Sequence, residues 1–242
     1  MFHSICGHSR YPREALSIRV NPCSSVVKQF LASASLGLAL ATAAFAAGGN
    51  IRVEITDAKG QPIADAIASL APLEAAPALT PPTEPVVIAQ QDEEFTPYVT
   101  AVVAGTRVSF PNRDKVQHHV YSLSKSKSFE LPLYKDETHD PILFDKPGIV
   151  ALGCNIHDWM SAYLVVLGTP YFAKTAADGL APLSTVPPGR YRLEVWHPRI
   201  ASVVTRDVTV DPGDPGTQVI AVTLKPDRRI RRAPETGGGG YR

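Results

Sequence analysis

The sequence predicts an all-β protein made of two β-sandwiches. Short segments that alternate apolar and polar residues recur along the chain, and turn residues bound each of them. The 242 residues include 22 prolines and 17 glycines, which favour many short segments over long helices. No segment keeps a 3.6-residue apolar period over the length of a helix. These three observations exclude a helical bundle.

The strands can be placed in chain order. Residues 51–57 alternate cleanly and end in the turn Asp57-Ala-Lys-Gly60, and residues 66–70 are the candidate return strand. Residues 71–85 hold five prolines and are expected to form an irregular spacer. Further strands are predicted over residues 106–110, 120–123, 148–152, 162–167, 191–196, 203–210 and 219–224.

The first 46 residues are predicted to be a signal peptide. Four basic residues precede an apolar run over residues 30–45, and Ala44-Phe45-Ala46 is a small-x-small cleavage site. A transmembrane anchor is the alternative, but the run is shorter than the roughly 20 residues that a spanning helix needs. We therefore expect export to the bacterial periplasm, with no stable membrane insertion after cleavage.

Charge and composition limit the possible partners. Charged residues make up 19% of the chain and hydrophobic residues 44%, as in globular proteins. The formal net charge of +1 argues against a protein that binds nucleic acid along its whole length. Residues 225–242 carry six Lys or Arg against two acids and then four consecutive glycines, which predicts a disordered basic tail.

The informative motif is Cys154-Asn-Ile-His157-Asp-Trp-Met160, a C-x2-H-x2-M between two predicted strands. Cys154 is the single cysteine left after signal cleavage, so no disulfide can form within one mature chain. Thiolate, imidazole and thioether are soft or borderline ligands, and two His, one Cys and a distant Met form a blue-copper centre. His118 or His119 would supply the second imidazole. The alternative is a buried Cys154 with Met160 in the core and His157 at the surface.

The upstream residues carry a family resemblance. Val108-x-Phe-x-Asn112-Arg-Asp-x-x-x-His118, followed by the C-x2-H-x2-M, resembles the cupredoxin pattern, most closely that of amicyanin-like proteins. The resemblance covers residues 86–167. It implies a Greek-key sandwich over residues 76–167 and one type 1 copper held by His118, Cys154, His157 and Met160. Cupredoxins commonly have Asn after the first ligand; here it is His119, which stays an alternative to His118.

Other phrases resemble two further groups. His118-His-Val-Tyr-Ser, Phe129-Glu-Leu and Trp196-His-Pro are similar to bacterial proteins labelled methylamine-utilisation proteins. Residues 51–70 and 174–195 resemble the two halves of a carboxypeptidase-regulatory, prealbumin-like sandwich. We therefore expect one discontinuous sandwich over residues 47–75 and 168–224, with the cupredoxin domain inserted into it. A tandem arrangement, in which the N-terminal strand joins the nearest sheet, is the alternative.

Four protein ligands leave no open position for a substrate, so the sequence predicts an electron carrier and not an enzyme. The resemblance implies a redox partner protein such as a c-type cytochrome or a quinoprotein dehydrogenase. Storage or delivery of Cu(I), or a structural sandwich with a vestigial site, are the alternatives. Of the other histidines, His139 is expected to be solvated and His197 to be a hydrogen-bonded residue at a strand end. Trp159 and Tyr163 are expected to pack beside the ligand loop.

Overall fold

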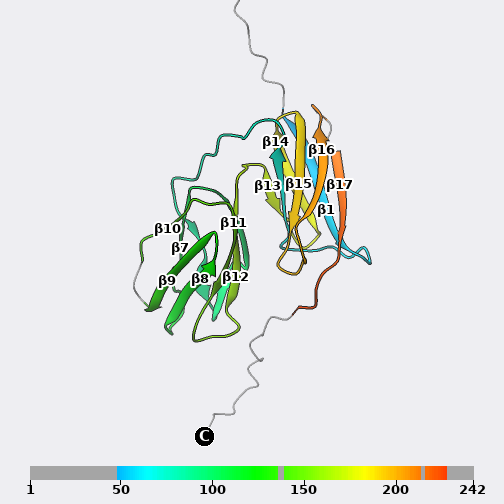
Figure 1. The fold of residues 1–242 in the computed structure, drawn as a ribbon. Coiled ribbons are helices and arrows are strands. Elements are labelled where there is room, and N and C mark those ends of the chain that lie inside the picture. Colours follow the sequence, from blue (N-terminus) through cyan, green and yellow to red (C-terminus); the bar gives the residue numbers. More distant parts are fainter. Residues whose placement is uncertain (1–47, 136–138, 214–215, 228–242) are drawn as a thin grey trace, which may run out of the picture. The chain divides into compact units, whose positions relative to one another are not determined.

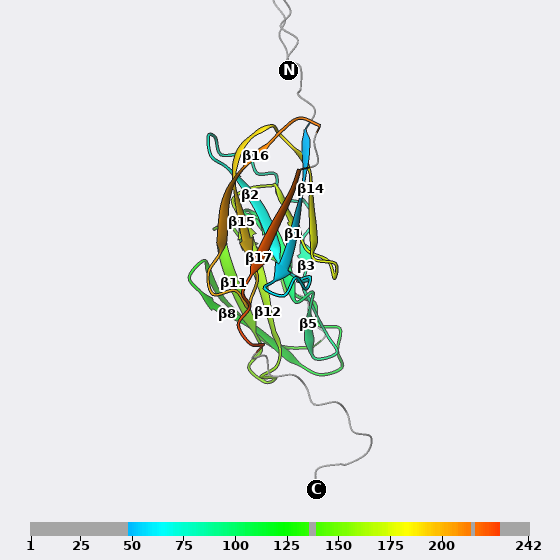
Figure 2. The same cartoon turned by 90° about the vertical axis from the view of Figure 1, so that its right-hand side faces the viewer.

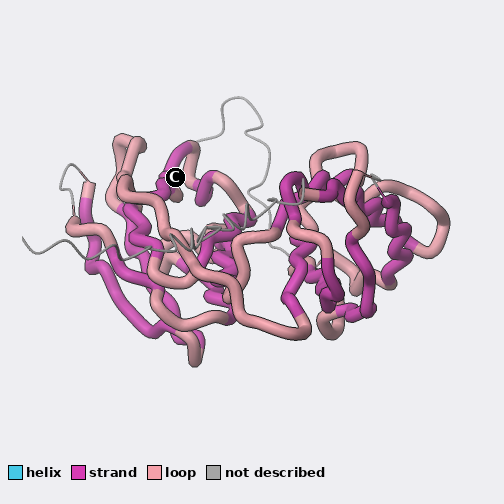
Figure 3. The backbone as a smooth tube through the Cα atoms, turned by 90° about the horizontal axis from the view of Figure 1, so that it is seen from above, coloured by secondary structure: helices cyan, strands magenta, loops and turns pink. Residues whose placement is uncertain are grey.

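The computed structural model describes residues 48–135, 139–213 and 216–227, so the predicted signal peptide and most of the basic tail lie outside the described residues. Within these ranges the chain forms seventeen strands and no helix, which confirms the all-β prediction. Figure 3 shows the same part of the chain as strands and loops alone. In this part, no helix has the length and apolar character needed to cross a membrane.

The central sandwich, strands β3 to β12, contains the ligand motif. Its larger sheet has the order β6-β12-β11-β8-β9 and its smaller sheet the order β10-β7-β3, beside a β4–β5 hairpin. Figure 1 labels β7 to β12 in this sandwich. Buried side chains from all three form one apolar core, which includes Cys154 and Met160. The strands are β3 (Val86–Val87), β4 (Ala89–Gln91), β5 (Glu94–Thr96), β6 (Val99–Val103), β7 (Thr106–Ser109), β8 (His118–Ser124), β9 (Lys127–Tyr134), β10 (Ile142–Phe144), β11 (Gly148–Gly153) and β12 (Ser161–Leu167).

The flanking sandwich is built from both ends of the described chain. One sheet has the order β14-β1-β17, with β1 between its two partners (Figure 2), and the other has the order β13-β2-β15-β16. Apolar side chains from both sheets share a second core. The strands are β1 (Gly49–Asp57), β2 (Ile67–Pro72), β13 (Phe172–Lys174), β14 (Leu180–Val186), β15 (Gly189–Trp196), β16 (Val204–Val210) and β17 (Gly216–Val222).

The predicted hairpin between the first two strands is wrong. β1 pairs antiparallel with β14 and parallel with β17, whereas β2 pairs with β13 and β15 in the opposite sheet. The turn itself forms, because the Asp57 carboxylate accepts hydrogen bonds from the amides of Lys59 and Gln61. Residues Ile67 to Leu70 are all buried, so this strand needs partners that cover both of its faces. The chain therefore crosses from one sheet to the other instead of returning along β1.

Candidate metal centre

Two antiparallel strands present the ligand loop. Gly153, the last residue of β11, pairs with Ser161, the first residue of β12, so residues 154–160 close the loop between them. A hydrogen bond from the Met160 amide to the His157 carbonyl, 3.0 Å long, tightens this loop. Gly153 also pairs with Tyr121 of β8, and a Cβ at Gly153 would lie 2.8 Å from the Tyr121 ring. Glycine thus lets β8, which begins at His118, pack closely beside Cys154.

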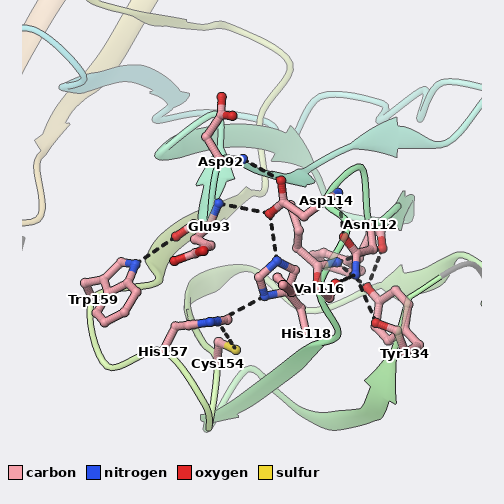
Figure 4. Close-up of polar contacts among 12 residues, drawn as sticks. Asp92, Glu93, Asn112, Asp114, Val116, His118, Tyr134, Cys154, His157 and Trp159 are labelled. Atoms are coloured by element: carbon pink, nitrogen blue, oxygen red, sulfur yellow. Dashed lines mark hydrogen bonds and ion pairs between the residues drawn. The ribbon is translucent and has the colours of Figure 1, made fainter. Parts of the chain in front are cut away.

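Three predicted ligands come together at the end of these strands (Figure 4). One ligand atom each from His118, Cys154 and His157 lies within 4.8 Å of the others. The two imidazole Nδ1 atoms are 3.1 Å apart, and the Cys154 Sγ is 3.8 Å from His157 Nδ1. His118 and Cys154 are buried, and His157 is half-buried. Two imidazole nitrogens and one thiol sulfur facing one point match the equatorial donors of a blue-copper site.

Asp114 fixes the orientation of the His118 ring. Its Oδ2 lies 2.7 Å from His118 Nε2. The imidazole proton is therefore on Nε2, and this N–H donates a hydrogen bond to the carboxylate. The lone pair of His118 Nδ1 is then left facing the other candidate ligands. A carboxylate on the distal nitrogen of a metal-binding imidazole also makes the ligand more basic.

Asn112 holds the segment that carries Asp114. The Asn112 side-chain oxygen accepts a hydrogen bond from the Asp114 amide, and its Nδ2 donates to the carbonyls of Val116 and Tyr134. One amide side chain therefore ties the β7–β8 connection to the end of β9. The sequence motif included Asn112 and Asp114, but sequence reasoning gave neither residue a role. The spacing of Asp114 four residues before His118 is the signal that could have revealed the pair.

The Asp114 carboxyl is held ionised. Its burial raises the pKa, but hydrogen bonds from the Glu93 amide, from His118 and from the Asp92 amide together hold the pKa of Asp114 below its usual value. The carboxylate is therefore available as an acceptor at neutral pH.

His119 points away from this cluster. Neighbouring residues of a strand face opposite sides of the sheet, and the His119 Nε2 lies 2.8 Å from the Glu130 carboxylate of β9. Its ring packs on Tyr121 with centroids 5.5 Å apart, and its buried Nδ1 has no hydrogen-bond partner in the part of the chain that the structure describes. This placement favours His118 over His119 as the ligand.

Met160 is the last residue of the loop, and its side chain is 2% exposed in the same core as Cys154. A buried thioether at this place fits the distant fourth ligand of the predicted set, and the ligand role of Met160 stays a prediction. The nitrogen, sulfur and thioether donors together fit copper. They fit structural zinc poorly, because structural zinc takes four nitrogen or thiolate donors.

The other side chains that the sequence analysis singled out differ in how well the structure matches their expected surroundings. Trp159 packs on the His157 ring with centroids 5.2 Å apart, as expected, whereas Tyr163 packs on Tyr98. His197 follows β15, and its Nδ1 accepts a hydrogen bond from the Arg199 amide, as expected for a strand-end residue. The expectation of a solvated His139 is wrong. Its ring is half-buried and packs edge-on against the Tyr134 ring, with centroids 4.6 Å apart, and its Nε2 atom is buried.

Tyr134 is a buried hydroxyl close to the centre that sequence reasoning missed. Its side chain is 2% exposed, its hydroxyl donates to the Phe110 carbonyl, and Gln90 Nε2 donates to the same hydroxyl. Burial raises the pKa of Tyr134 to about 12, the hydrogen bond from Gln90 opposes this rise, and the charge of Cys154 adds to it.

This pKa predicts a loss of stability in alkali. The ordinary pKa is 10.0, so the unfolded chain gives up this proton before the folded chain does. The free energy of unfolding of the wild type should therefore fall between pH 10 and about 12 relative to Tyr134→Phe. Urea titrations of both proteins across this range measure the difference. A difference that stays constant with pH would contradict the assignment.

No family model matches the chain, and no curated protein matches it. Among solved structures, the chain is similar to a reduced amicyanin variant at 20% identity, over 41% of this chain and 98% of that one, with a TM-score of 0.33. It is similar to a purple cupredoxin from Nitrosopumilus maritimus at 21% identity, over 34% of this chain and 96% of that one, with a TM-score of 0.29. It is also similar to a Cu-containing nitrite reductase from Thermus scotoductus SA-01 at 25% identity, over 48% of this chain but 28% of that one, with a TM-score of 0.33.

Proposed function

We propose that this chain is an exported type 1 copper protein that carries single electrons between redox partners in the periplasm. The observation that supports the proposal best is the convergence of His118 Nδ1, Cys154 Sγ and His157 Nδ1 at one end of the central sandwich, with the His118 tautomer set by Asp114. A copper ion held there would supply a one-electron couple. His118, Cys154, His157 and Met160 would hold it.

The surroundings of the cluster favour electron transfer over catalysis. His118, Cys154 and Met160 are each at most 5% exposed, so substrate has no access to the ion from their side. His157 is half-buried, exposed Ile156 directly precedes it, and exposed Val116 lies two residues before His118. An electron would therefore leave through the His157 edge, toward a partner protein that contacts this surface. A c-type cytochrome or a quinoprotein dehydrogenase is the class of partner we propose.

The test is the visible spectrum of the signal-free chain after addition of one equivalent of Cu(II). We expect an intense blue thiolate-to-copper band that is absent from Cys154→Ser, because the band requires the sulfur ligand. The band should bleach with one electron per copper and return on reoxidation. A colourless protein that binds Cu(I) would favour storage or delivery. No binding of either ion would leave a structural sandwich.

A further inference from the structure

The turn of the β4–β5 hairpin is hydrogen-bonded to two side chains, Asp114 and Trp159, that each contact an imidazole of the ligand cluster. This two-residue turn, Asp92 and Glu93, joins Gln91 to Glu94, which pair across the hairpin. Both turn residues have positive φ, 56° and 57°, as a type I′ turn requires. Asp92 is a common residue at the first position of such a turn, but Glu93 stands where glycine is usual, so contacts elsewhere must hold the Glu93 backbone in this conformation.

Asp114 makes the first of these contacts. Its Oδ1 accepts a hydrogen bond from the Asp92 amide at 2.7 Å, and its Oδ2 accepts one from the Glu93 amide at 2.9 Å. The same Oδ2 also accepts a hydrogen bond from the His118 Nε2–H. One carboxylate thus joins the turn to a candidate metal ligand, and it uses both oxygens to do so (Figure 4).

Trp159 makes the second contact, from the ligand loop. Its indole Nε1–H donates to the Glu93 carbonyl at 3.0 Å, and its ring packs on His157. The turn therefore receives one side chain that orients His118 and one that covers His157. Figure 4 shows this series of contacts, which begins at His118, passes through Asp114, Glu93 and Trp159, and ends at His157.

We propose that the Asp92–Glu93 turn is a clamp that couples the positions of the two imidazole ligands. Asp114 and Trp159 are its positioning residues, and neither binds the metal. When either hydrogen bond is removed, the turn backbone can shift, and the side chain on the other side of the turn is then held less firmly. This inference rests on the proposed copper site and adds to it the residues that hold the site in shape before the metal binds.

A double-mutant cycle tests the coupling. Asp114→Asn keeps the size of the side chain but leaves one acceptor oxygen for three donors, and Trp159→Phe keeps a ring over His157 but removes the N–H. We expect each variant to weaken Cu(II) binding by about 10- to 100-fold in competition with a chelator, the usual effect of losing a partner of a metal ligand. The double variant should lose clearly less than the product of the two single losses. The blue band of each single variant should also shift, which a purely structural role would not cause.

Glu94→Gln is the matched control, since Glu94 is exposed on the same hairpin. It should bind copper as the wild type does. Losses in the single variants that multiply in the double variant would overturn the clamp and leave two independent contacts. Single variants that match Glu94→Gln in affinity and spectrum would also overturn it, whatever their effect on metal-free unfolding. In both cases the wild-type blue band would leave the proposed function standing, whereas a wild type without that band would remove both.

Discussion

Replacement of His118 by alanine is expected to abolish the stabilisation that copper gives to the folded chain, whereas His119→Ala should keep it. A ligand that binds only the folded state, present at about 1,000 times its Kd, adds about 4 kcal/mol to the free energy of unfolding. His118 supplies an Nδ1 that faces the other donors, and His119 is bonded to Glu130 on the far side of the strand. The measurement is urea unfolding of each variant with and without excess Cu(II).

The pair of variants is informative because the two histidines are neighbours on one strand and both are buried. Each substitution removes the same imidazole from a similar depth, so general loss of packing affects both metal-free proteins. The gain on adding copper is the quantity that separates them. If His119→Ala loses that gain and His118→Ala keeps it, then the assignment of the first ligand is reversed.

The sequence was sufficient to predict the elements that carry the ligands. β11 and β12 were predicted as residues 148–152 and 162–167, and the structure has them as Gly148–Gly153 and Ser161–Leu167. Both are apolar runs bounded by glycine or by the motif itself, so local pattern determines them. Cys154 and His157 lie close together because they share the short loop between two paired strands. His118 joins them because β8, which begins at His118, pairs with β11 at Gly153.

Long-range pairing was not predictable in the same way. β1 lies parallel to β17, which is more than 150 residues away in the sequence, and nothing in residues 49–57 specifies that partner. β9 was not predicted at all, because it contains Pro132 and three of its last four residues are partly or fully exposed. The contacts of Asp114 were hidden for the same reason. They depend on the β4–β5 turn, and a turn of Asp and Glu lacks the glycine that usually marks a type I′ hairpin in a sequence.

Phe144→Ala should cause the largest loss of stability in the central sandwich. Phe144 is 1% exposed at the end of β10, and its ring lies 5.9 Å from that of Phe129 and 6.5 Å from that of Phe110. Removal of a buried aromatic ring leaves a cavity and costs about 3–5 kcal/mol. Single domains are stable by about 5–15 kcal/mol, so the variant should keep only part of its stability. Urea unfolding of the metal-free protein measures the effect without any contribution from binding.

Leu123→Ala is the control, because Leu123 is 83% exposed on β8 of the same sandwich. Surface substitutions of this kind change stability by about 0.5 kcal/mol or less. Phe144 shares one core cluster with Cys154 and Met160 of the ligand loop, and Phe110 and Phe129 pack in the same cluster. A cavity there therefore also weakens the packing under the ligand loop. We therefore expect Phe144→Ala to weaken copper binding as well, and Phe144→Leu to recover part of both losses. Equal stabilities of Phe144→Ala and Leu123→Ala would show that this core does not hold the sandwich together.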